Sequence, residues 1–433
     1  MNEFDFIVGE PISDEVRKKA VEDSKKMNEV AGRYASNDAF KMTCGEDIFN
    51  FEENKKKLID DLNWLVKLSV EEFTFRKKWE EIQLLNDYIK GFDTQAKACI
   101  WSPTDLNNEE LTIKEINNLR PKAVVVDSEE TEHLWTTLRY YCSSAEYNQA
   151  PGRFIKFLMM DEVSNKVLGI CSIASDVISI SDRDKFIGWT KDDKLKHKML
   201  KYSAIGTTIV PTQPFGANFL GGKLTAALVV SNAVRSEWEK DRGEAKPCKL
   251  VGMTTTSLYG GFSMYNSLKW WKPVGMSKGK VPIKPYEGGY KTWHDWLKQF
   301  KKKEYNEAMT QKEGVAGPVT GAKMRVLNMI FNACGIRQSQ YQHGFCRGIY
   351  FSEFYENGRD FLCRKITEDK LIMKPLFKGD VDEILTWWKP KAISRYLKLK
   401  NENRLNFEKL FYSDMGGMSY EDAKSKYFQD VGR

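Results

Sequence analysis

The feature that most limits the possible folds is a series of strand-like segments between residues 122 and 256, interrupted once by a helix-like segment. Four short apolar segments rich in β-branched or aromatic residues come first, and the last of them, SAIGTTIVP, ends at Pro211. The longer segment FGANFLGGKLTAALVVSNAVRSEWEKDRG then has the length and the charged end of a helix, and KLVGMTTT returns to a strand pattern. Strands followed by a helix and another strand predict a sheet core covered by helices, of the α/β or α+β class.

The segments on either side of this core have a different residue pattern, which is mainly helical. Apolar residues recur at helical spacing over residues 13–35 and 54–91, and residues 290–312 are aromatic, basic and helix-like. The segment RGIYFSEFYENGRDFLC predicts two strands around its Asn-Gly turn. We therefore predict three parts, which are an N-terminal helical region (1–120), a core domain (121–285) and a C-terminal α+β extension that is basic and aromatic (286–433).

Composition narrows the cellular setting and the chemistry. The chain has 433 residues, a net charge of +7, four histidines and eight scattered cysteines without a Cys-x-x-Cys pair. The first residues are acidic and lack an apolar segment, so we expect a cytoplasmic protein with reduced thiols and no membrane partner. No Gly-x-Ser-x-Gly and no P-loop sequence occurs, which argues against a hydrolase triad and a P-loop nucleotide site.

Two further patterns bear on metals and on nucleic acids. Cys334, His343, Cys346 and Cys363 are residue types that zinc accepts, but their spacing matches no common zinc site, and we predict no metal. The strips YKTWHDWLKQFKKK and WWKPKAISRYLKLK have the composition of nucleic-acid contact surfaces, in which cations meet phosphates and rings stack on bases. Amphipathic packing helices have a similar composition, and the mild net charge permits a nucleic-acid partner without requiring one.

The order strand, VPTQPFGANFLGGKL, helix, strand, YNSLKWWKPVG resembles the core of GCN5-related N-acetyltransferases (GNAT). The resemblance implies an α+β core with a mixed, mostly antiparallel sheet, in which two central strands diverge and open a cleft. It also implies that backbone amides after the first of these strands hold the donor's pyrophosphate, as free amides at a helix N-terminus favour an anion. The residues that it assigns to donor binding are Val210, Gln213, Gly216, Ala217 and Asn218.

The donor loop departs from the GNAT pattern at two positions. Asn218 stands where that family has a small residue, and Pro214 removes one backbone donor. The identity of the donor therefore stays open between an acyl-CoA and an aminoacyl-tRNA.

A longer set of motifs resembles the DruA-like family of the Druantia anti-phage system, over residues 130 to 285 and as far as 355. The resemblance implies a role in phage–host conflict, and the GNAT-like architecture suggests comparison with the Mom-like DNA-modification proteins of phages, which modify adenine. The matching residues are Arg183, Asp184, Ile187, Gly188, Trp189, Pro211, Thr255, Tyr259, Gly260, Tyr265, Trp270, Val274, Gly275, Ser277 and Gly279.

Three residues are candidates for proton transfer. Acyl transfer to an amine needs groups that accept and return a proton, and a tyrosine at the GNAT position of Tyr265 can face the donor thioester. A buried core tyrosine with one hydrogen bond would have the same sequence context. Tyr259 stands beside two glycines, which are typical of a tight turn near a cleft. Asp176 follows a strand, where a carboxylate can be a general base or lie in a solvated turn.

The other candidates would contact the substrate. Arg183 and Asp184 can clamp a phosphate or orient a base edge, or they can form a buried ion pair that fixes a loop. The family motif adds Trp189 and Thr255 to this set. Trp270 can stack on a flipped base, and we expect it to lie with its neighbour in a strand, so that the two indoles point to opposite faces.

The function that these patterns predict is a nucleic-acid-directed acyl or aminoacyl transferase that acts in phage–host conflict. A second hypothesis is a non-catalytic DNA-binding component of a defence or counter-defence complex, and a third is a virion-associated protein. DNA is the expected acceptor or partner, with RNA and protein left open, and the sequence does not define the oligomeric state.

Overall fold

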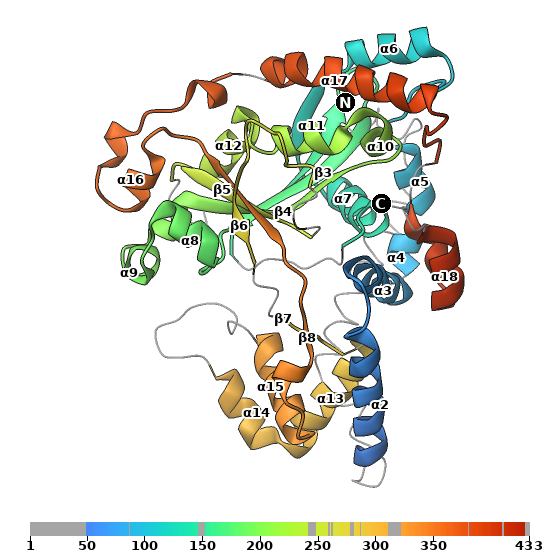
Figure 1. Cartoon of the computed structure of the whole chain (residues 1–433), viewed down its shortest axis with the longest axis vertical. Coiled ribbons are helices and arrows are strands. Elements are labelled where there is room, and N and C mark those ends of the chain that lie inside the picture. The colour runs from blue at the N-terminus through green and yellow to red at the C-terminus, as the bar shows by residue number, and fades with distance from the viewer. Residues whose placement is uncertain are drawn as a thin grey trace. The chain divides into compact units, whose positions relative to one another are not determined.

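The structure is a computed structural model of the whole chain (Figure 1). It describes residues 49–85, 87–145, 152–240, 248–258, 260, 263–277, 281–285, 287–310, 322–379, 381–408 and 411–428. Contacts divide these residues into two compact units, one built from residues 81–278 and 346–428 and the other from residues 49–80 and 279–345. The helix that we predict over residues 13–35 lies outside the described residues.

The first unit is built on a seven-stranded sheet in the order β1-β2-β3-β4-β5-β9-β6. Neighbouring strands are antiparallel except β4 and β5, which are parallel. The predicted α+β class and the mixed, mostly antiparallel sheet are therefore confirmed. The strands are β1 (Pro121–Val125), β2 (Phe154–Asp161), β3 (Lys166–Ser175), β4 (Ser203–Pro211), β5 (Gly252–Ser257), β6 (Lys272–Met276) and β9 (Gly348–Glu353).

The two parallel strands in the middle of this sheet separate after a short ladder. β4 pairs with β5 only from Ser203 opposite Gly252 to Gly206 opposite Thr255. Beyond Gly206, β4 continues to Pro211 bonded to β3 alone, while β5 stays paired with β9 along its whole length. β4 and β5 therefore form a wedge that is closed at their N-terminal ends and widens toward their C-terminal ends.

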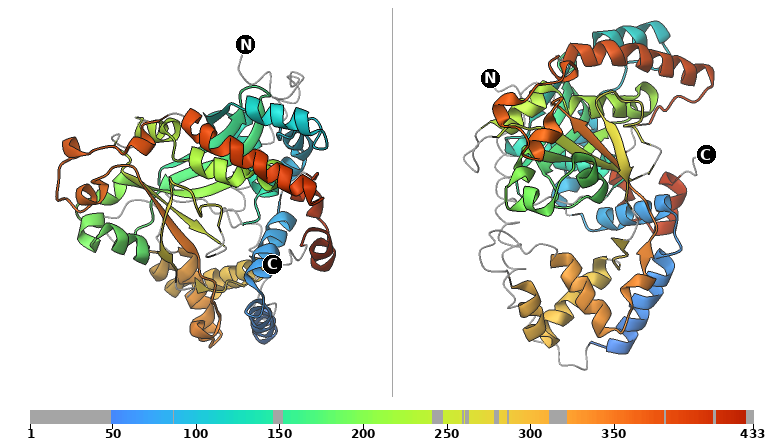
Figure 2. Two further views of the ribbon diagram at one scale, coloured as in Figure 1. Left: turned by 45° about the horizontal axis from the view of Figure 1, so that its top comes forward. Right: turned by 60° about the vertical axis from the view of Figure 1, so that its left-hand side comes forward.

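Helices cover both faces of the sheet (Figures 1 and 2). α11 packs on β3 and β4, and α17 lies across α10 and α11, because residues at helical spacing from Leu385 to Leu399 point inward and are buried. α7 packs on β2 and β3, and α8 packs on β6 and β9. The helices are α4 (Asp87–Lys90), α5 (Asp93–Ala98), α6 (Glu109–Asn118), α7 (Glu129–Cys142), α8 (Ser181–Ile187), α9 (Lys191–Leu195), α10 (Phe215–Phe219), α11 (Gly221–Leu228), α12 (Asn232–Glu239), α16 (Gly358–Leu362), α17 (Val381–Asn401) and α18 (Tyr420–Tyr427).

The second unit is a small helical cluster whose sequence is inserted partly between β6 and β9. Its core contains Leu58, Leu62, Trp293, Leu297 and Ile330. The helical prediction for residues 290–312 is confirmed by α13 and α14 up to Met309. The elements are α2 (Phe51–Leu65), the start of α3 (Val70–Gln83), α13 (Glu287–Phe300), α14 (Lys302–Met309), α15 (Ala322–Ala333), β7 (Val281–Pro282) and β8 (Gln342–His343).

Several predicted elements are wrong in their extent or type. The single helix expected after Pro211 is three helices, because Leu220 adopts a left-handed conformation with φ of 54° and the chain turns again before α12. The segment 54–91 is likewise divided among α2, α3 and α4. The hairpin expected at Asn357-Gly358 does not form, since β9 is followed there by α16. Among the described helices, none combines the length and apolar character that a membrane span requires.

The start of β5 tolerates no side chain larger than hydrogen. A Cβ at Gly252 would lie 2.2 Å from Cζ of Phe351, which is buried on β9. We predict that Gly252→Ala lowers the free energy of unfolding by about 1–3 kcal/mol through overpacking, as measured by urea denaturation. Adding Phe351→Leu should restore part of this loss, whereas Gly289→Ala, with nothing within 4 Å of its Cβ, should not destabilise the protein. Equal effects of the two glycine substitutions would contradict the packing explanation.

Candidate functional site

A buried ion network lies at the closed end of the wedge. Asp176 follows β3, and its Oδ1 accepts a hydrogen bond of 2.6 Å from Nη1 of Arg183 on α8. Its Oδ2 accepts from Ser203 at the start of β4 and from Thr254 on β5, at 2.5 Å and 3.0 Å. Burial raises the pKa of the Asp176 carboxyl, while the Arg183 guanidinium and these hydroxyl donors act to lower it. Asp176 therefore ties three strands and a helix together.

The network continues from α8 to α9. Asp184 accepts from Nε and Nη2 of Arg183 at 2.9 Å and 2.6 Å, and its second oxygen pairs with Lys194 of α9. The guanidinium also lies 5.2 Å from the ring centroid of Trp189, whose Nε1 donates to the carbonyl of Leu362 at 2.9 Å. Two carboxylates are thus balanced by two cations, and the structure brings the predicted residues Arg183, Asp184 and Trp189 together with Asp176.

The second group of predicted residues lies at the end of the parallel ladder, where the wedge begins. The ring of Tyr265 is 5.0 Å from that of Tyr350 on β9 and 5.4 Å from that of Trp271, and its hydroxyl lies 3.4 Å from Oγ1 of Thr255. Thr255 donates to the carbonyl of Gly206, where the parallel ladder ends, at 3.0 Å. Tyr265 is 5% exposed, and burial raises the pKa of its phenol well above the usual range. The hydroxyl is therefore a neutral group inside a packed aromatic cluster.

These two groups lie on opposite faces of the sheet. Thr254 contacts Asp176 and the adjacent Thr255 contacts Tyr265. Successive side chains of a strand point to opposite faces, so a single substrate in one cleft would not reach both Asp176 and Tyr265. Phe351, opposite Thr254, packs on α8, and Tyr350, opposite Thr255, packs on Tyr265, which agrees with this division.

The loop expected to bind a donor pyrophosphate is bonded within itself. The amide of Gly216 donates to the carbonyl of Thr212 at 2.8 Å, and the amide of Ala217 donates to the side chain of Gln213 at 2.9 Å. The amide of Asn218 donates to the carbonyl of Pro214 at 3.1 Å. Val210, just before this loop, is paired with β3. The donor-binding assignment of these residues stays a prediction.

Asn218 has a structural contact that its position in the motif does not reveal. Its side chain donates to the carbonyl of Asn406 at 2.7 Å and accepts from the amide of Asn406 at 2.9 Å. Asn218 is fully buried by this contact. The residue that replaces the small GNAT residue therefore holds the segment that follows α17.

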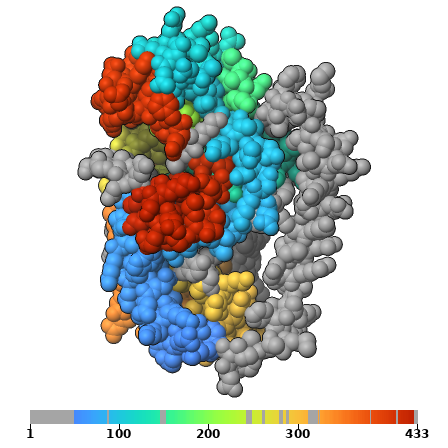
Figure 3. Space-filling model, turned by 90° about the vertical axis from the view of Figure 1, so that its right-hand side faces the viewer, coloured from blue at the N-terminus to red at the C-terminus, as the bar shows by residue number. Residues whose placement is uncertain are grey.

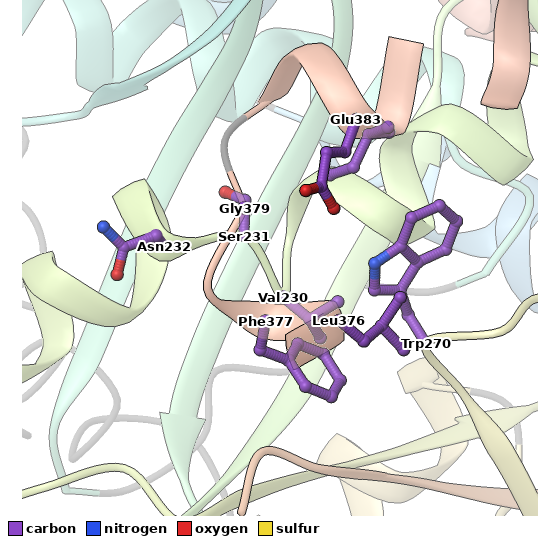
Figure 4. A pocket seen from close by; sticks show the side chains of 9 residues that line it. Val230, Ser231, Asn232, Trp270, Leu376, Phe377, Gly379 and Glu383 are labelled. Atoms are coloured by element: carbon purple, nitrogen blue, oxygen red, sulfur yellow. The ribbon is translucent and has the colours of Figure 1, made fainter. Parts of the chain in front are cut away.

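Trp270 and Trp271 lie in the turn before β6, not in a strand as predicted, and both are buried. Nε1 of Trp271 donates to the carbonyl of Ala226 on α11 at 2.6 Å, and Trp270 packs edge-on against Trp387 of α17 at 5.2 Å. Trp270 also lines a small hollow (Figure 4). Glu383 and the N-terminal end of α12 line the same hollow, with Leu376, Phe377 and Ile384 as its apolar walls.

Two sequence predictions remain. Tyr259 lies outside the described residues. Within the part of the chain that the structure describes, no group of three or more histidine, cysteine or acidic side chains could hold a metal ion. Cys334 packs in the core of the second unit, and Cys363 donates its thiol to the carbonyl of Ile187 in the first.

Comparison with known proteins identifies the family. The family model described as Druantia protein DruA matches residues 93–364, which is more than half of the chain. The chain belongs to the DruA family. Druantia protein DruA of Escherichia coli (strain UMEA 4076-1) is 26% identical to it over 224 residues, which cover 49% of this chain and 53% of that protein. The chain thus spans about half the length of this relative, and no solved structure matches it.

The DruA match contains every strand of the sheet and both residue groups described above, but it ends before α17. Sequence reasoning missed Lys194, Ser203 and Tyr350 in these groups. Lys194 lies in a lysine-rich stretch with no periodic pattern, and Ser203 is only the first residue of a strand. The pairing of β9 with β5 brings Tyr350 to Tyr265, and no local signal in the sequence predicts it.

The buried network predicts a large loss of stability when its central cation is removed. Arg183→Met leaves Asp176 and Asp184 buried with only one cation between them, and we expect the free energy of unfolding to fall by about 3–5 kcal/mol. Urea denaturation measures this change. Lys185→Met, on the same helix but exposed, is the matched control and should change stability little. A loss below about 1 kcal/mol for Arg183→Met would show that the network is not desolvated as described.

The buried phenol predicts an alkaline difference between Tyr265 and phenylalanine. Folding keeps Tyr265 protonated, whereas the unfolded tyrosine ionises near a pKa of about 10, so its contribution to stability is constant below that pH and falls above it. We predict that wild type loses stability above that pH faster than Tyr265→Phe, by up to about 1.4 kcal/mol per pH unit. Parallel denaturation curves at all alkaline pH values would contradict burial of the phenol.

Proposed function

We propose that this chain is a nucleic-acid-binding component of an anti-phage defence system, and that its core is GNAT-like with a cleft occupied by its own side chains. Membership of the DruA family supports the defence role, because Druantia is an anti-phage system. The observation that carries the proposal is the aromatic cluster of Tyr265, Trp271 and Tyr350, which packs beside the end of the parallel ladder where β4 and β5 separate.

The order and divergence of the central elements support the GNAT-like core. β4 is followed by α10, α11 and α12 and then by β5, which pairs in parallel with β4 over four residues and then leaves it. This is the arrangement that the resemblance predicts for a strand, donor loop, helix and second strand. The name GNAT-like describes the fold only, since function is decided by the chemistry of the site.

Two observations support a binding role over acyl transfer. The amides of Gly216, Ala217 and Asn218 are already bonded within the loop, so holding a pyrophosphate would require that the loop lose these bonds. The candidate base Asp176 accepts bonds from Arg183, Ser203 and Thr254 on the face away from Tyr265. Its lone pairs are used in holding the fold.

The basic surface of α17 supports a nucleic-acid partner. From Lys389 to Lys400 this helix carries five basic residues and no acidic residue. Its apolar face packs on the core, so Lys391 and Lys398, two turns apart, are exposed on the outer face. Figure 3 shows the end of α17 at the surface beside α6. Clustered lysines and arginines on one face attract the phosphate backbone.

A second candidate is a nucleic-acid-directed acyl or aminoacyl transferase, and one observation favours it. The Tyr265 hydroxyl is neutral and lies beside Thr255, near the point where β4 and β5 separate, where a general acid could return a proton to the leaving group. In that reaction the acceptor amine attacks the acyl carbon, and the bond to the thiol of acyl-CoA or the ribose oxygen of an aminoacyl-tRNA breaks. The leaving group takes up the proton that the amine has lost.

Mass spectrometry of nucleosides tests the choice between these candidates. The nucleoside composition of cells carrying the complete defence system with the wild-type chain should equal that of cells with Tyr265→Phe. Cells with either chain should restrict phage plating equally. A modified nucleoside present only with the wild-type chain would overturn the binding proposal in favour of the transferase. Tyr265→Phe is a suitable variant because it removes only a hydroxyl whose contact with Thr255 is 3.4 Å long.

A further inference from the structure

We propose that Lys223, Lys269 and Lys391 together form a binding site for a backbone phosphate of nucleic acid. This inference rests on the proposed nucleic-acid-binding function and names the residues that carry it. The three lysines belong to three separate segments, which are α11, the turn before β6 and α17. The fold is therefore required to bring them together.

The first two segments are joined by a direct contact. Nζ of Lys223 donates to the carbonyl of Asn266 at 2.5 Å and lies 3.4 Å from the carbonyl of Met264. A Cβ at Gly222, the preceding residue of α11, would lie 3.0 Å from the sulfur of Met264. The N-terminal turn of α11 is thus packed against the turn that leads to Lys269.

Two indoles connect this turn to α17. Nζ of Lys269 lies 4.7 Å from the ring centroid of Trp270, the Trp270 and Trp387 centroids are 5.2 Å apart, and Nζ of Lys391 lies 5.5 Å from the Trp387 centroid. A cation over an indole face is held in place while its ammonium stays accessible. Lys269 and Lys391 are exposed, so each can reach a ligand.

The charges of this cluster are not neutralised by neighbouring acids. Among the described residues, no carboxylate lies within ion-pair distance of these three ammonium groups. Burial, and then the positive charge of Lys391, lower the pKa of Lys223. Glu383 lines the hollow beside Trp270, but its carboxylate lies against Gly379.

A phosphodiester is the ligand that this arrangement fits. Like charges gathered without a counter-ion are stabilised by a bound anion, and lysine ammonium groups bind phosphate as point charges without requiring bidentate geometry. The polyanionic backbone also supplies further phosphates for Lys398, which lies seven residues after Lys391 on the same exposed face.

The experiment compares two double charge reversals by their effect on binding of labelled nucleic acid over a series of salt concentrations. Lys269→Glu with Lys391→Glu should weaken binding at least about tenfold and lower the slope of log K against log salt by about 2, one unit for each lost phosphate contact. Lys185→Glu with Lys196→Glu makes the same charge change on exposed residues of α8 and the end of α9, and should weaken binding less than about threefold. Thermal unfolding of each variant establishes that it is folded.

The possible outcomes separate this inference from the proposed function. Duplex DNA, single-stranded DNA and single-stranded RNA serve as the three probes, and the one bound most tightly identifies the source of the phosphate. If wild type binds none of them, the proposed function fails. If wild type binds but the two double variants weaken binding equally, the binding function stands and the three-lysine site is overturned.

Discussion

The structure depends on the short parallel ladder between β4 and β5. Only four residues of each strand pair, and the ladder ends at Gly206 and Thr255. The register of β4 against β3 shifts at Ser172, just where β4 leaves β5, and a local irregularity of this kind bends and twists a strand. Tyr265 contacts Thr255 at the end of the ladder, and Trp271 packs on Tyr265 and bonds to α11. The ladder thus determines where the wedge opens and where the aromatic cluster begins.

The buried ion network has a different role from the aromatic packing. Removing two carboxylates and two cations from water is costly, and their mutual attraction offsets that cost only when every group is bonded. Asp176 and Arg183 meet this condition, since both are fully bonded at the point where β3, β4, β5 and α8 meet. Such a network contributes little net stability relative to apolar packing, but it requires one arrangement of these elements. It therefore fixes the path of residues 176–203 between β3 and β4.

The sequence predicts well the parts of this fold that local patterns determine. SAIGTTIVP matches β4 because alternation and a final proline mark a strand and its end. The sheet core covered by helices follows from the order of segments, while its mixed pairing is what the GNAT resemblance implies. The hairpin prediction at Asn357 is wrong because an Asn-Gly pair is compatible with the start of a helix as well as with a hairpin, and tertiary packing selects the helix. The sequence motif identifies Arg183 and Asp184, and a buried ion pair is one of its two interpretations. Nothing in the sequence identifies Lys194 as their partner. The contact between Asn218 and Asn406 joins residues 188 positions apart, which one sequence without homologues cannot reveal.

The helix α17 connects the turn beside the wedge to the basic surface. α17 is held over α10 and α11 by Trp388, which donates to the carbonyl of Leu220, and by Tyr396, which donates to the carbonyl of Leu106. The same docking places Trp387 against Trp270 and so brings Lys391 to the cluster that Lys223 and Lys269 begin. The region that matches the DruA family supplies two of the three lysines, and α17, which lies beyond that match, supplies the third. A helix that covers the core from outside thereby also completes its positive surface, because Trp387 packs on the same turn that carries Tyr265 and Lys269.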